Sequence, residues 1–544
     1  MSDTSSGPFA PLRMPIFRRI WTGGLISNLG LMIQGVGAAW AMTTLTDRAD
    51  MIALVQSALL IPIMLFAIPA GALADMFDRR VIGLVSTALS LSAAIVLTVI
   101  TFLGWLTPPL ILIMTFLLGT GMALFGPAWQ ASVGEQVPPR MLPAAIALNS
   151  ISYNIGRSFG PAIGGLIVAA LGAVVAFLIN ALFYIPLLII LYLWQRPYVE
   201  PRLPPERIDR AIISGIRYAA HAPAIRTVVV RTALTGLAGA SIPALLPLLA
   251  RDILAGGAST FGFMLGAYGI GAITGAAQIS RLRRSFTTET LIRWCSAIAG
   301  AAIVALAASR SLPLSLLLLV IVGAAWMVVL TCFNVVIQLA APRWVTGRAL
   351  AAYQSAIAGG MGVGAWLWGQ VARDQGTVAA LIGSGALLLI APVMGRWLRT
   401  DDSDTDRESV EGKELDVALP LTGRSGPIVV EIDYRVTADN ARSFYTAMLQ
   451  VQSIRHRNGG YGWSLSRALD DEQQWTERFH CPTWHDYLRM RDRTTGHESA
   501  IVAQATAFAV GEAALGVRRY LERPFGSVRW RENTPDPGMS YPTA

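Results

Sequence analysis

The sequence predicts an all-α membrane protein whose helices form two similar halves, followed by a small C-terminal α+β domain. Three observations support this fold class. Of the 544 residues, 53% are hydrophobic and only 14% are charged, whereas water-soluble domains carry about 25% charged residues. Long apolar runs follow one another from about residue 20 to residue 398. An acidic segment comes next, and the composition beyond it is that of a soluble domain.

Twelve apolar windows are long enough to be transmembrane helices, because roughly 20 apolar residues cross a hydrocarbon core of about 30 Å. They lie near residues 18–43, 52–73, 81–104, 109–132, 144–170, 173–194, 227–250, 261–280, 288–308, 313–338, 349–371 and 377–397. The fifth and sixth windows form one apolar run that is divided at Gly172. An even number of crossings places both chain ends on the same side of the membrane.

An internal repeat predicts that these helices form two six-helix halves in the same orientation. At a constant offset of 204 residues, several glycine, arginine and proline positions coincide. The pairs include Gly71 with Gly275, Arg79 with Arg283, Arg80 with Arg284, Pro138 with Pro342 and Gly160 with Gly364. Parallel repeats of this kind are typical of secondary transporters. The repeat therefore favours a transporter over a channel or a membrane enzyme.

The arginines of the loops predict the orientation in the membrane. Most of them fall in one set of connections, while the alternate connections hold only Arg48, Arg251, Arg310 and Arg373. Because cytoplasmic loops carry an excess of Lys and Arg, we expect a multi-pass protein of the bacterial inner membrane with both termini in the cytoplasm. The middle loop contains an amphipathic segment around Ile212, which we expect to lie along the membrane surface.

The predicted organisation has five parts. They are a six-helix half at 1–194, the middle loop at 195–226, a second half at 227–399, an acidic linker at 400–424 and the α+β domain at 425–530. The chain has three cysteines and five histidines, and none of them shows the spacing of a metal site. No metal, cofactor or nucleic-acid partner is expected.

The connection after the second window contains a compact motif. It reads Gly71-Ala-Leu-Ala-Asp75-Met-Phe-Asp78-Arg79-Arg80. Gly71 permits a close approach of helices, Asp75 can pair with an arginine of a neighbouring helix, and the two arginines anchor the loop. The alternative is a simple positively charged turn.

This motif resembles the G-x-L-A-D-x-x-[GD]-R-[RK] loop of the major facilitator superfamily, and it occupies the same place in the chain. The resemblance implies a loop that switches between conformations. In the second half, Ile279 and Leu282 replace the two aspartates, so we expect the carboxylate switch in the first half only.

The fifth window is rich in glycine and resembles the antiporter-type motif of exporters in this superfamily. The motif positions are Gly156, Gly160, Pro161, Gly164 and Gly165. Small residues permit helices to pack closely, and proline introduces a bend.

Arg157 lies inside this window, where a cation usually faces a cavity or a partner. Two interpretations are open: contact with substrate or coupling ion, and a structural pair with Glu135 or Asp75. A proton carrier is usually a buried carboxylate, and none lies deep in any window, so Asp75, Glu135 and Asp252 are the candidates for coupling.

Other polar residues are candidates for contact with a substrate. Asn28 and Gln34 of the first window and Gln130 of the fourth are selected because those helices line a central cavity in the superfamily, and Asn149 and Asn154 of the fifth window are further candidates. For most polar residues inside the windows, the alternative is a hydrogen bond between helices. Trp129, beside Gln130, could stack on an aromatic substrate or simply pack.

The C-terminal domain is predicted as strand, helix, strand, strand, helix and a last helical or extended segment, an order that suggests a ferredoxin-like fold. Its sequence from Trp463 to Thr495 is similar to the tail of the transmembrane secretion effector subgroup, which is related to enterobactin exporters. Small domains of this shape also form dimeric monooxygenases that use no cofactor. Self-association through this domain is therefore expected to be possible.

Together, these features predict a secondary active transporter that exports small molecules, drug-like or siderophore-like, by alternating access coupled to protons or another ion. The chain is not expected to be an enzyme. The alternatives are a membrane-anchored enzyme with a monooxygenase tail, and a sensor or scaffold with a transporter-like body.

Overall fold

The computed structural model describes residues 9–195, 220–341, 346–395, 421–492, 494–510 and 515–522, with a few single positions between these ranges. The chain divides into two compact units. A helical unit contains Met1–Ile212, Thr227–Ile337 and Leu350–Asp402, and a C-terminal unit contains the remainder. Most of the predicted surface segment of the middle loop and most of the acidic linker lie outside the described residues.

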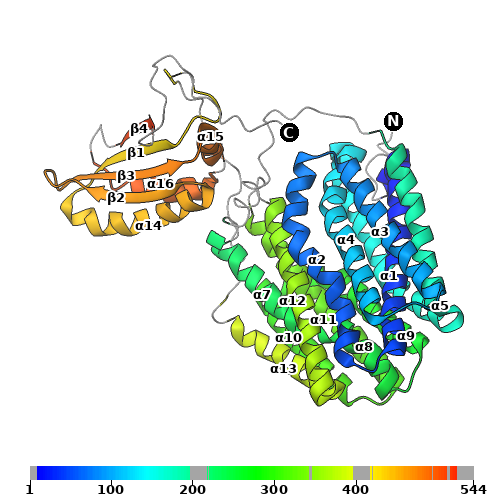
Figure 1. Ribbon diagram of the computed structural model, residues 1–544. Helices are drawn as coiled ribbons and strands as arrows, with labels where there is room; N and C mark the ends of the chain where they lie inside the picture. Colours follow the sequence, from blue (N-terminus) through cyan, green and yellow to red (C-terminus); the bar gives the residue numbers. More distant parts are fainter. Residues whose placement is uncertain are drawn as a thin grey trace, which may run out of the picture. The chain divides into compact units, whose positions relative to one another are not determined.

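The helical unit is a bundle of long apolar helices (Figure 1). The helices of its first half are α1 (Pro15–Leu45), α2 (Ala49–Met76), α3 (Arg79–Phe102), α4 (Pro108–Gln136) and α5 (Leu142–Leu193). Those of the second half are α7 (Pro223–Gly239), α8 (Ser241–Leu248), α9 (Ala258–Ser285), α10 (Thr288–Ala308), α11 (Leu312–Ala340), α12 (Thr346–Gln375) and α13 (Thr377–Met394). Within the described part of the chain, nine helices are long and apolar enough to cross a membrane.

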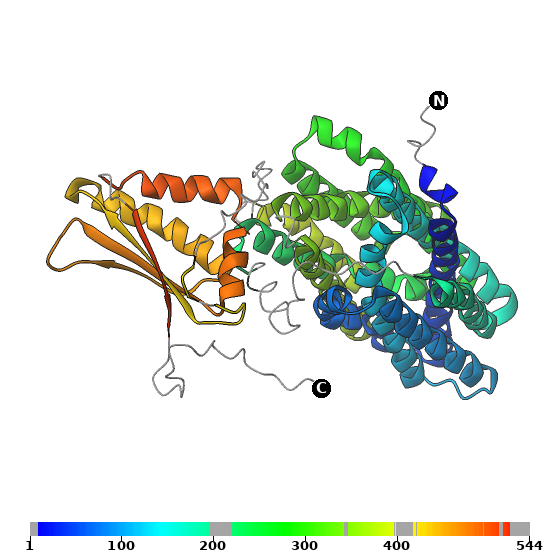
Figure 2. The same ribbon diagram turned by 90° about the horizontal axis from the view of Figure 1, so that it is seen from above.

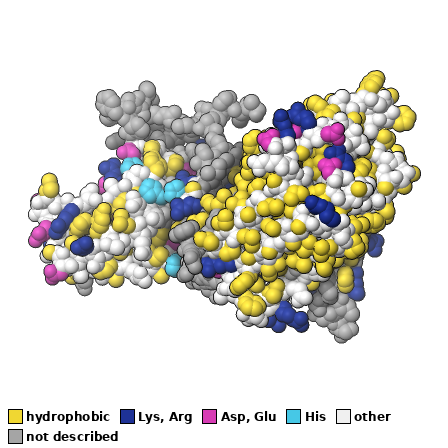
Figure 3. Space-filling view, turned by 90° about the horizontal axis from the view of Figure 1, so that it is seen from below, with side chains coloured by type: hydrophobic (Ala, Val, Ile, Leu, Met, Phe, Trp, Pro, Cys, Tyr) yellow, Lys and Arg dark blue, Asp and Glu magenta, His cyan; other side chains and the backbone are white. Residues whose placement is uncertain are grey.

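Hydrophobic side chains cover much of the visible face of the helical unit (Figure 3). Such a surface suits contact with lipid, because soluble proteins rarely expose large apolar patches. The exposed apolar residues include aromatic side chains such as Phe102, Trp105 and Trp294. The sequence prediction of a multi-pass membrane protein is confirmed at this level.

Gly172 divides α5 as the sequence predicts. Its φ of 80° and ψ of 171° are not helical, and a positive φ favours glycine because it has no Cβ. Residues 142–171 and 173–193 are thus two helices with a break between them. In the second half, α7 and α8 continue into a π-helical turn, Leu249–Ile253, and together form one apolar segment.

Hydrogen bonds between a hydroxyl and a carbonyl join the two halves at two helix pairs. Helix α2 packs against α12, where the Ser57 hydroxyl donates to the Gly362 carbonyl over 2.7 Å and the Ser355 hydroxyl donates to the Met64 carbonyl over 2.5 Å. Helix α5 packs against α9, where the Ser158 hydroxyl donates to the Gly269 carbonyl over 3.2 Å. Hydroxyl-to-carbonyl bonds need close backbones, and small residues permit that closeness.

The C-terminal unit is a four-stranded antiparallel sheet with helices. Its elements are β1 (Ile428–Arg435), α14 (Ala441–Asn458), β2 (Tyr461–Arg467), β3 (Gln474–Cys481), α15 (Trp484–Asp492), α16 (Gly496–Thr506) and β4 (Leu515–Leu521). The strand order is β2-β3-β1-β4. Helices α14 and α16 contact each other and are seen together in Figure 2.

One face of the first strand is buried in the core of this unit. Val430, Ile432, Tyr434 and Val436 are all buried. They pack on an apolar core that includes Phe444 of α14. The period of two along β1 places these side chains on one face of the sheet.

Candidate functional site

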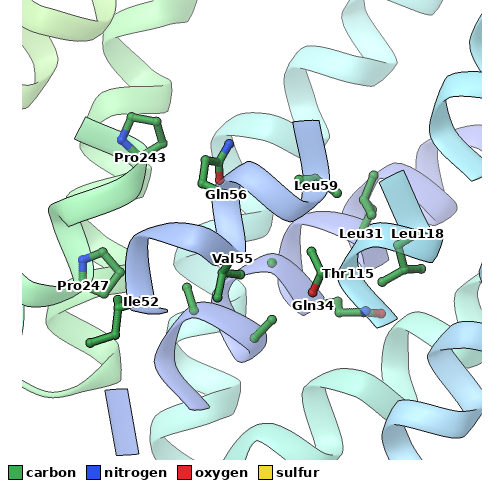
Figure 4. A pocket seen from close by; sticks show the side chains of 13 residues that line it. Leu31, Gln34, Ile52, Val55, Gln56, Leu59, Thr115, Leu118, Pro243 and Pro247 are labelled. Atoms are coloured by element: carbon green, nitrogen blue, oxygen red, sulfur yellow. The ribbon is translucent and has the colours of Figure 1, made fainter. Parts of the chain in front are cut away.

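A small cavity, partly open to solvent, lies between α1, α2 and α4 of the first half and α8 of the second half. Its lining residues are Leu31, Gln34, Gly35, Ala38, Ala39, Ile52, Val55, Gln56, Leu59, Thr115, Leu118, Pro243 and Pro247. Figure 4 shows the two prolines of α8 on the opposite side of the view from Gln34 and Thr115. Because both halves supply lining, a ligand held here contacts both.

Two of these residues have a polar side-chain atom that is buried and unpaired. The side-chain amide of Asn180, on the second part of α5, donates to Gln34 Oε1. Among the described residues, Gln34 Nε2 and Thr115 Oγ1 have no hydrogen-bond partner, although the two residues are only 2% and 5% exposed. Sequence analysis identified Gln34 as a candidate, but Thr115 and the supporting Asn180 emerge only from the structure.

The other polar candidates lie outside this cavity. Asn28 packs on Gly156 of α5, and the Asn154 side chain donates to a carbonyl of its own helix over 2.8 Å. Gln130 is exposed, and Asn149 is partly exposed. Trp129 packs against Phe125 with ring centroids 5.1 Å apart.

The first glycines of the fifth-helix motif bring α5 close to α1. A Cβ placed on Gly160 would lie 2.5 Å from the Met32 Cβ, and one on Gly164 would lie 3.0 Å from the Ile33 Cα. Such short distances leave no room for a side chain. The motif therefore packs helices within the first half.

The remaining motif residues lie where α5 meets α9. A Cβ on Gly165 would lie 2.6 Å from the Gly262 Cα, and one on Gly262 would lie 2.9 Å from the Pro161 carbonyl oxygen. The guanidinium carbon of Arg157 lies 5.8 Å from the centre of the Tyr268 ring on α9. This is a cation–π distance, and it places Arg157 at the interface between the halves.

Arginines fix the loop between α2 and α3 to the ends of α4 and α5. Arg79 Nη1 donates to Glu135 Oε1 over 2.6 Å, which forms an ion pair. Arg80 Nε donates to the Leu191 carbonyl at the end of α5 over 2.9 Å. The Asp78 carboxylate accepts from the Arg80 backbone N–H over 2.8 Å and caps α3. The loop is thus more than a charged turn.

The expectation for Gly71 is wrong in this structure. A Cβ on Gly71 would meet no heavy atom of the described residues within 4 Å, whereas one on its repeat counterpart Gly275 would lie 2.4 Å from the Ala324 carbonyl oxygen. The close approach therefore occurs in the second half only. The side chain of Asp75 lies outside those that the structure describes, and its role as a switch stays a prediction.

Ion pairs join the two halves at the end of the bundle where α1 leads into α2. Arg48 Nη2 lies 2.6 Å from Asp50 Oδ2, and Arg373 Nη1 of α12 lies 3.6 Å from the same oxygen. Arg251 Nη1, from the π-helical turn, donates to the Thr43 carbonyl over 2.8 Å. These three arginines are among the four that the arginine-poor connections contain. Their rarity in those connections could have identified them as functional candidates from the sequence.

A second charged cluster in the second half was missed by sequence analysis. Arg231 on α7 is buried, and its Nη1 lies 2.6 Å from Glu289 Oε2. Glu289 Oε1 accepts from Arg293 Nε over 2.8 Å. Arg293 Nη2 donates to the Gly395 carbonyl over 2.7 Å, and Arg231 Nη1 donates to the Leu398 carbonyl over 2.9 Å.

The C-terminal unit buries a carboxylate in its core. Glu477 Oε1 accepts from Arg455 Nε and from Trp463 Nε1, each over 3.0 Å, and Oε2 accepts from the Tyr434 hydroxyl over 2.9 Å. Burial and the adjacent Glu477 carboxylate raise the pKa of the Tyr434 phenol well above its usual value. Among the described residues, no group of three His, Cys, Asp or Glu side chains is placed to hold a metal.

Known transporters are similar in sequence to large parts of the chain. The multidrug efflux pump Tap of Mycolicibacterium fortuitum is 26% identical over 408 residues, which cover 73% of this chain and 97% of the pump. The staphyloferrin A transporter of Staphylococcus aureus is 28% identical over 247 residues, which cover 45% of this chain and 62% of that protein.

Solved transporter structures share the fold. A bacterial homologue of the lysosomal transporter Spinster, in an inward-facing and unoccupied conformation, matches with a TM-score of 0.54 at 15% identity, over 71% of this chain and 95% of its own. An auto-inhibited peptide transporter of the POT family matches with a TM-score of 0.60 at 12% identity, over 72% and 98%. The model of the transmembrane secretion effector family matches residues 6–525. The chain therefore belongs to the transmembrane secretion effector family of major facilitator transporters.

Proposed function

We propose that this transporter exports small molecules from the bacterial cytoplasm by alternating access, driven by protons or another ion. The efflux and siderophore transporters among its relatives support this direction and substrate range. The chain has no Walker-type phosphate-binding loop, which favours an ion gradient over ATP as the energy source.

The proposal includes twelve crossings of the inner membrane, with both termini in the cytoplasm. The nine apolar helices become ten because Gly172 divides α5, and α12 and α13 bring the number to twelve. The arginine distribution supports the orientation. It places the Asp50 ion pairs at the extracytoplasmic end of the bundle.

The observation that best supports alternating access is that contacts between the two halves close the extracytoplasmic end of the bundle. Arg373 reaches Asp50, and Arg251 reaches the Thr43 carbonyl, so the second half is held against the first just beyond the cavity. A carrier must break such contacts to release its substrate outward and form them again to reset. The ion pairs therefore act as an extracytoplasmic latch, formed by Asp50, Arg48, Arg373, Arg251 and Thr43.

Efflux measurements test the proposed function. Expression in a host that lacks its own pumps should lower the steady-state accumulation of a neutral lipophilic dye, and a protonophore should restore it. A strain with the empty vector is the control. Equal accumulation in the two strains across a panel of lipophilic dyes would contradict export, and efflux that survives the protonophore would contradict proton drive.

Removing the charge of the latch should slow transport. We expect Asp50→Asn to reduce the initial rate of dye efflux by up to about fivefold, because an ion pair with a half-exposed arginine contributes about 0–1 kcal/mol to the closed state. The matched control is Arg310→Gln, since Arg310 also lies in an arginine-poor loop but donates to carbonyls of its own half. Equal rates in the two variants would exclude a latch at Asp50.

We also propose that the C-terminal unit has the ferredoxin-like topology and permits self-association. The order β2-β3-β1-β4 and the placement of helices after β1 and β3 support this topology. Strands β2 and β4 are the outer strands of the sheet, and such strands offer unpaired backbone groups to a second copy. An enzymatic role is not part of the proposal, because the family and the relatives are transporters.

A further inference from the structure

Arg157 of α5 is a cation without a counter-ion. Among the described residues, no carboxylate pairs with it, and Glu135, one of its two predicted partners, is paired with Arg79. Arg157 contacts the ring of Tyr268 in the second half, but a ring does not neutralise the charge. A cation inside a membrane helix usually faces a partner or a water-filled space. A negatively charged molecule is therefore the partner that this position lacks.

The neighbours of Arg157 in α5 show which way its side chain points. Gly160 packs on α1, and Ser158 donates to Gly269 of α9. Phe159 is 54% exposed and lies about 200° around the helix from Arg157. Arg157 thus falls between the face that contacts α1 and the face that contacts α9, on the side opposite Phe159. Its side chain points into the bundle.

A row of side chains on this face of α5 is accessible from the end that begins at Leu142. Residues four apart in a helix lie one above another, and the row consists of Asn149, Tyr153, Arg157 and Pro161. Tyr153 is 44% exposed, and Asn149 is partly exposed. Arg157 is also partly exposed, whereas Pro161 is buried. In the proposed orientation, the accessible end faces the cytoplasm, and the latch closes the other end.

Arg157 lies deep enough to meet a molecule that has left bulk water. It is about 22 Å along the helix from Leu142, at a rise of about 1.5 Å per residue, and the hydrocarbon core is about 30 Å thick. An anionic group that reaches Arg157 gains an opposite charge in exchange for its lost hydration. The planar guanidinium matches a carboxylate with two parallel hydrogen bonds. A neutral molecule on the same path leaves the charge of Arg157 without a partner.

We propose that Arg157 binds the carboxylate of amphiphilic substrates, while the rings of Tyr153 and Tyr268 contact their apolar part. This inference rests on the proposed function, since it names the preferred substrate class of the exporter. Tyr268 belongs to the second half, so a substrate held here contacts both halves. Neutral lipophilic molecules remain substrates and bind more weakly, because they gain only the apolar contacts.

Binding of three fluorescent naphthalene dyes to the purified full-length protein at neutral pH tests the inference. The dyes share one ring and linker and differ in a single group, which is a carboxylate, the corresponding primary amide or a trimethylammonium. We expect the carboxylate dye to bind about tenfold to a hundredfold more tightly than the amide dye, the size of hydrogen bonds to a charged group. The ammonium dye should bind more weakly than the amide dye, because it meets a like charge.

The variant Arg157→Gln should abolish the preference for the carboxylate and leave binding of the amide dye unchanged. Arg157→Lys keeps the charge but lacks the planar fork, so it should retain only part of the preference, and it decides the question if Arg157→Gln does not fold. Arg283→Gln is the matched control, because Arg283 is an exposed arginine in the last turn of α9. A carboxylate dye that binds no more tightly than the other two, or a full preference in either Arg157 variant, would overturn the inference.

Uptake of the same dyes into energised inside-out membrane vesicles distinguishes the two proposals. Carboxylate-selective binding without uptake of any dye would contradict the exporter and leave the binding site standing. Uptake without carboxylate selectivity would contradict the binding site and leave the exporter standing.

Discussion

Replacing Gly165 with alanine should destabilise the helical unit and reduce transport. The new Cβ would lie 2.6 Å from the Gly262 Cα and 2.8 Å from the Ala258 carbonyl oxygen, so backbone rather than a mobile side chain must move. Overpacking of this kind costs about 1–3 kcal/mol. The melting temperature of the purified protein and the initial rate of dye efflux measure the two effects.

The matched control is Gly126→Ala, because a Cβ on Gly126 of α4 meets no heavy atom within 4 Å. Alanine is the better helix former by about 1 kcal/mol, so this variant should be as stable as the unmodified protein or more stable. If Gly165→Ala and Gly126→Ala melt at the same temperature, the halves do not meet at Gly165.

Glu289→Gln should destabilise the second half by about 3–5 kcal/mol, because it leaves the buried Arg231 without its counter-ion. The Arg231 side chain is only 4% exposed, and that of Glu289 is 16% exposed. The double variant Arg231→Met with Glu289→Gln should recover part of the loss, since it removes the stranded charge. Thermal unfolding of the full chain measures both.

Asp374→Asn is the matched control, because it removes the negative charge of an exposed carboxylate instead of a buried one. Asp374 lies 4.0 Å from Arg373 and is 69% exposed, and exposed ion pairs contribute about 0–1 kcal/mol. A loss of stability in this variant as large as that in Glu289→Gln would show that burial at Arg231 is not the cause.

The features that depend on local sequence could be predicted, and those that depend on distant partners could not. Apolar runs and the break at Gly172 follow from side chains near one another in the chain, as does the inward face of β1. Arg231 was overlooked because a single arginine near the start of an apolar run resembles a loop charge. Its partner Glu289 is 58 residues away, and no pattern in the chain connects the two.

The cavity was predicted only in part for the same reason. Gln34 stands out as a polar residue in an apolar helix, but Thr115 does not, because a threonine in a membrane helix usually bonds to its own backbone. Only the three-dimensional packing of α1, α4 and α8 shows that both side chains reach one space. At Gly71, the motif indicated a contact that the packing of this structure does not make.

The arginines that reach helix ends also bear on the history of the chain. Leu191 and Gly395 differ by the 204 residues of the internal repeat, and each carbonyl accepts from an arginine, Arg80 in the first half and Arg293 in the second. The donors are not repeat counterparts, since Arg80 aligns with Arg284. If one ancestral half was duplicated, the two copies kept the backbone carbonyl that accepts a hydrogen bond and changed the arginine that donates it. The common origin of the two halves is then visible in the position of the accepting carbonyl. A comparison of the arginine positions alone would not find this equivalence.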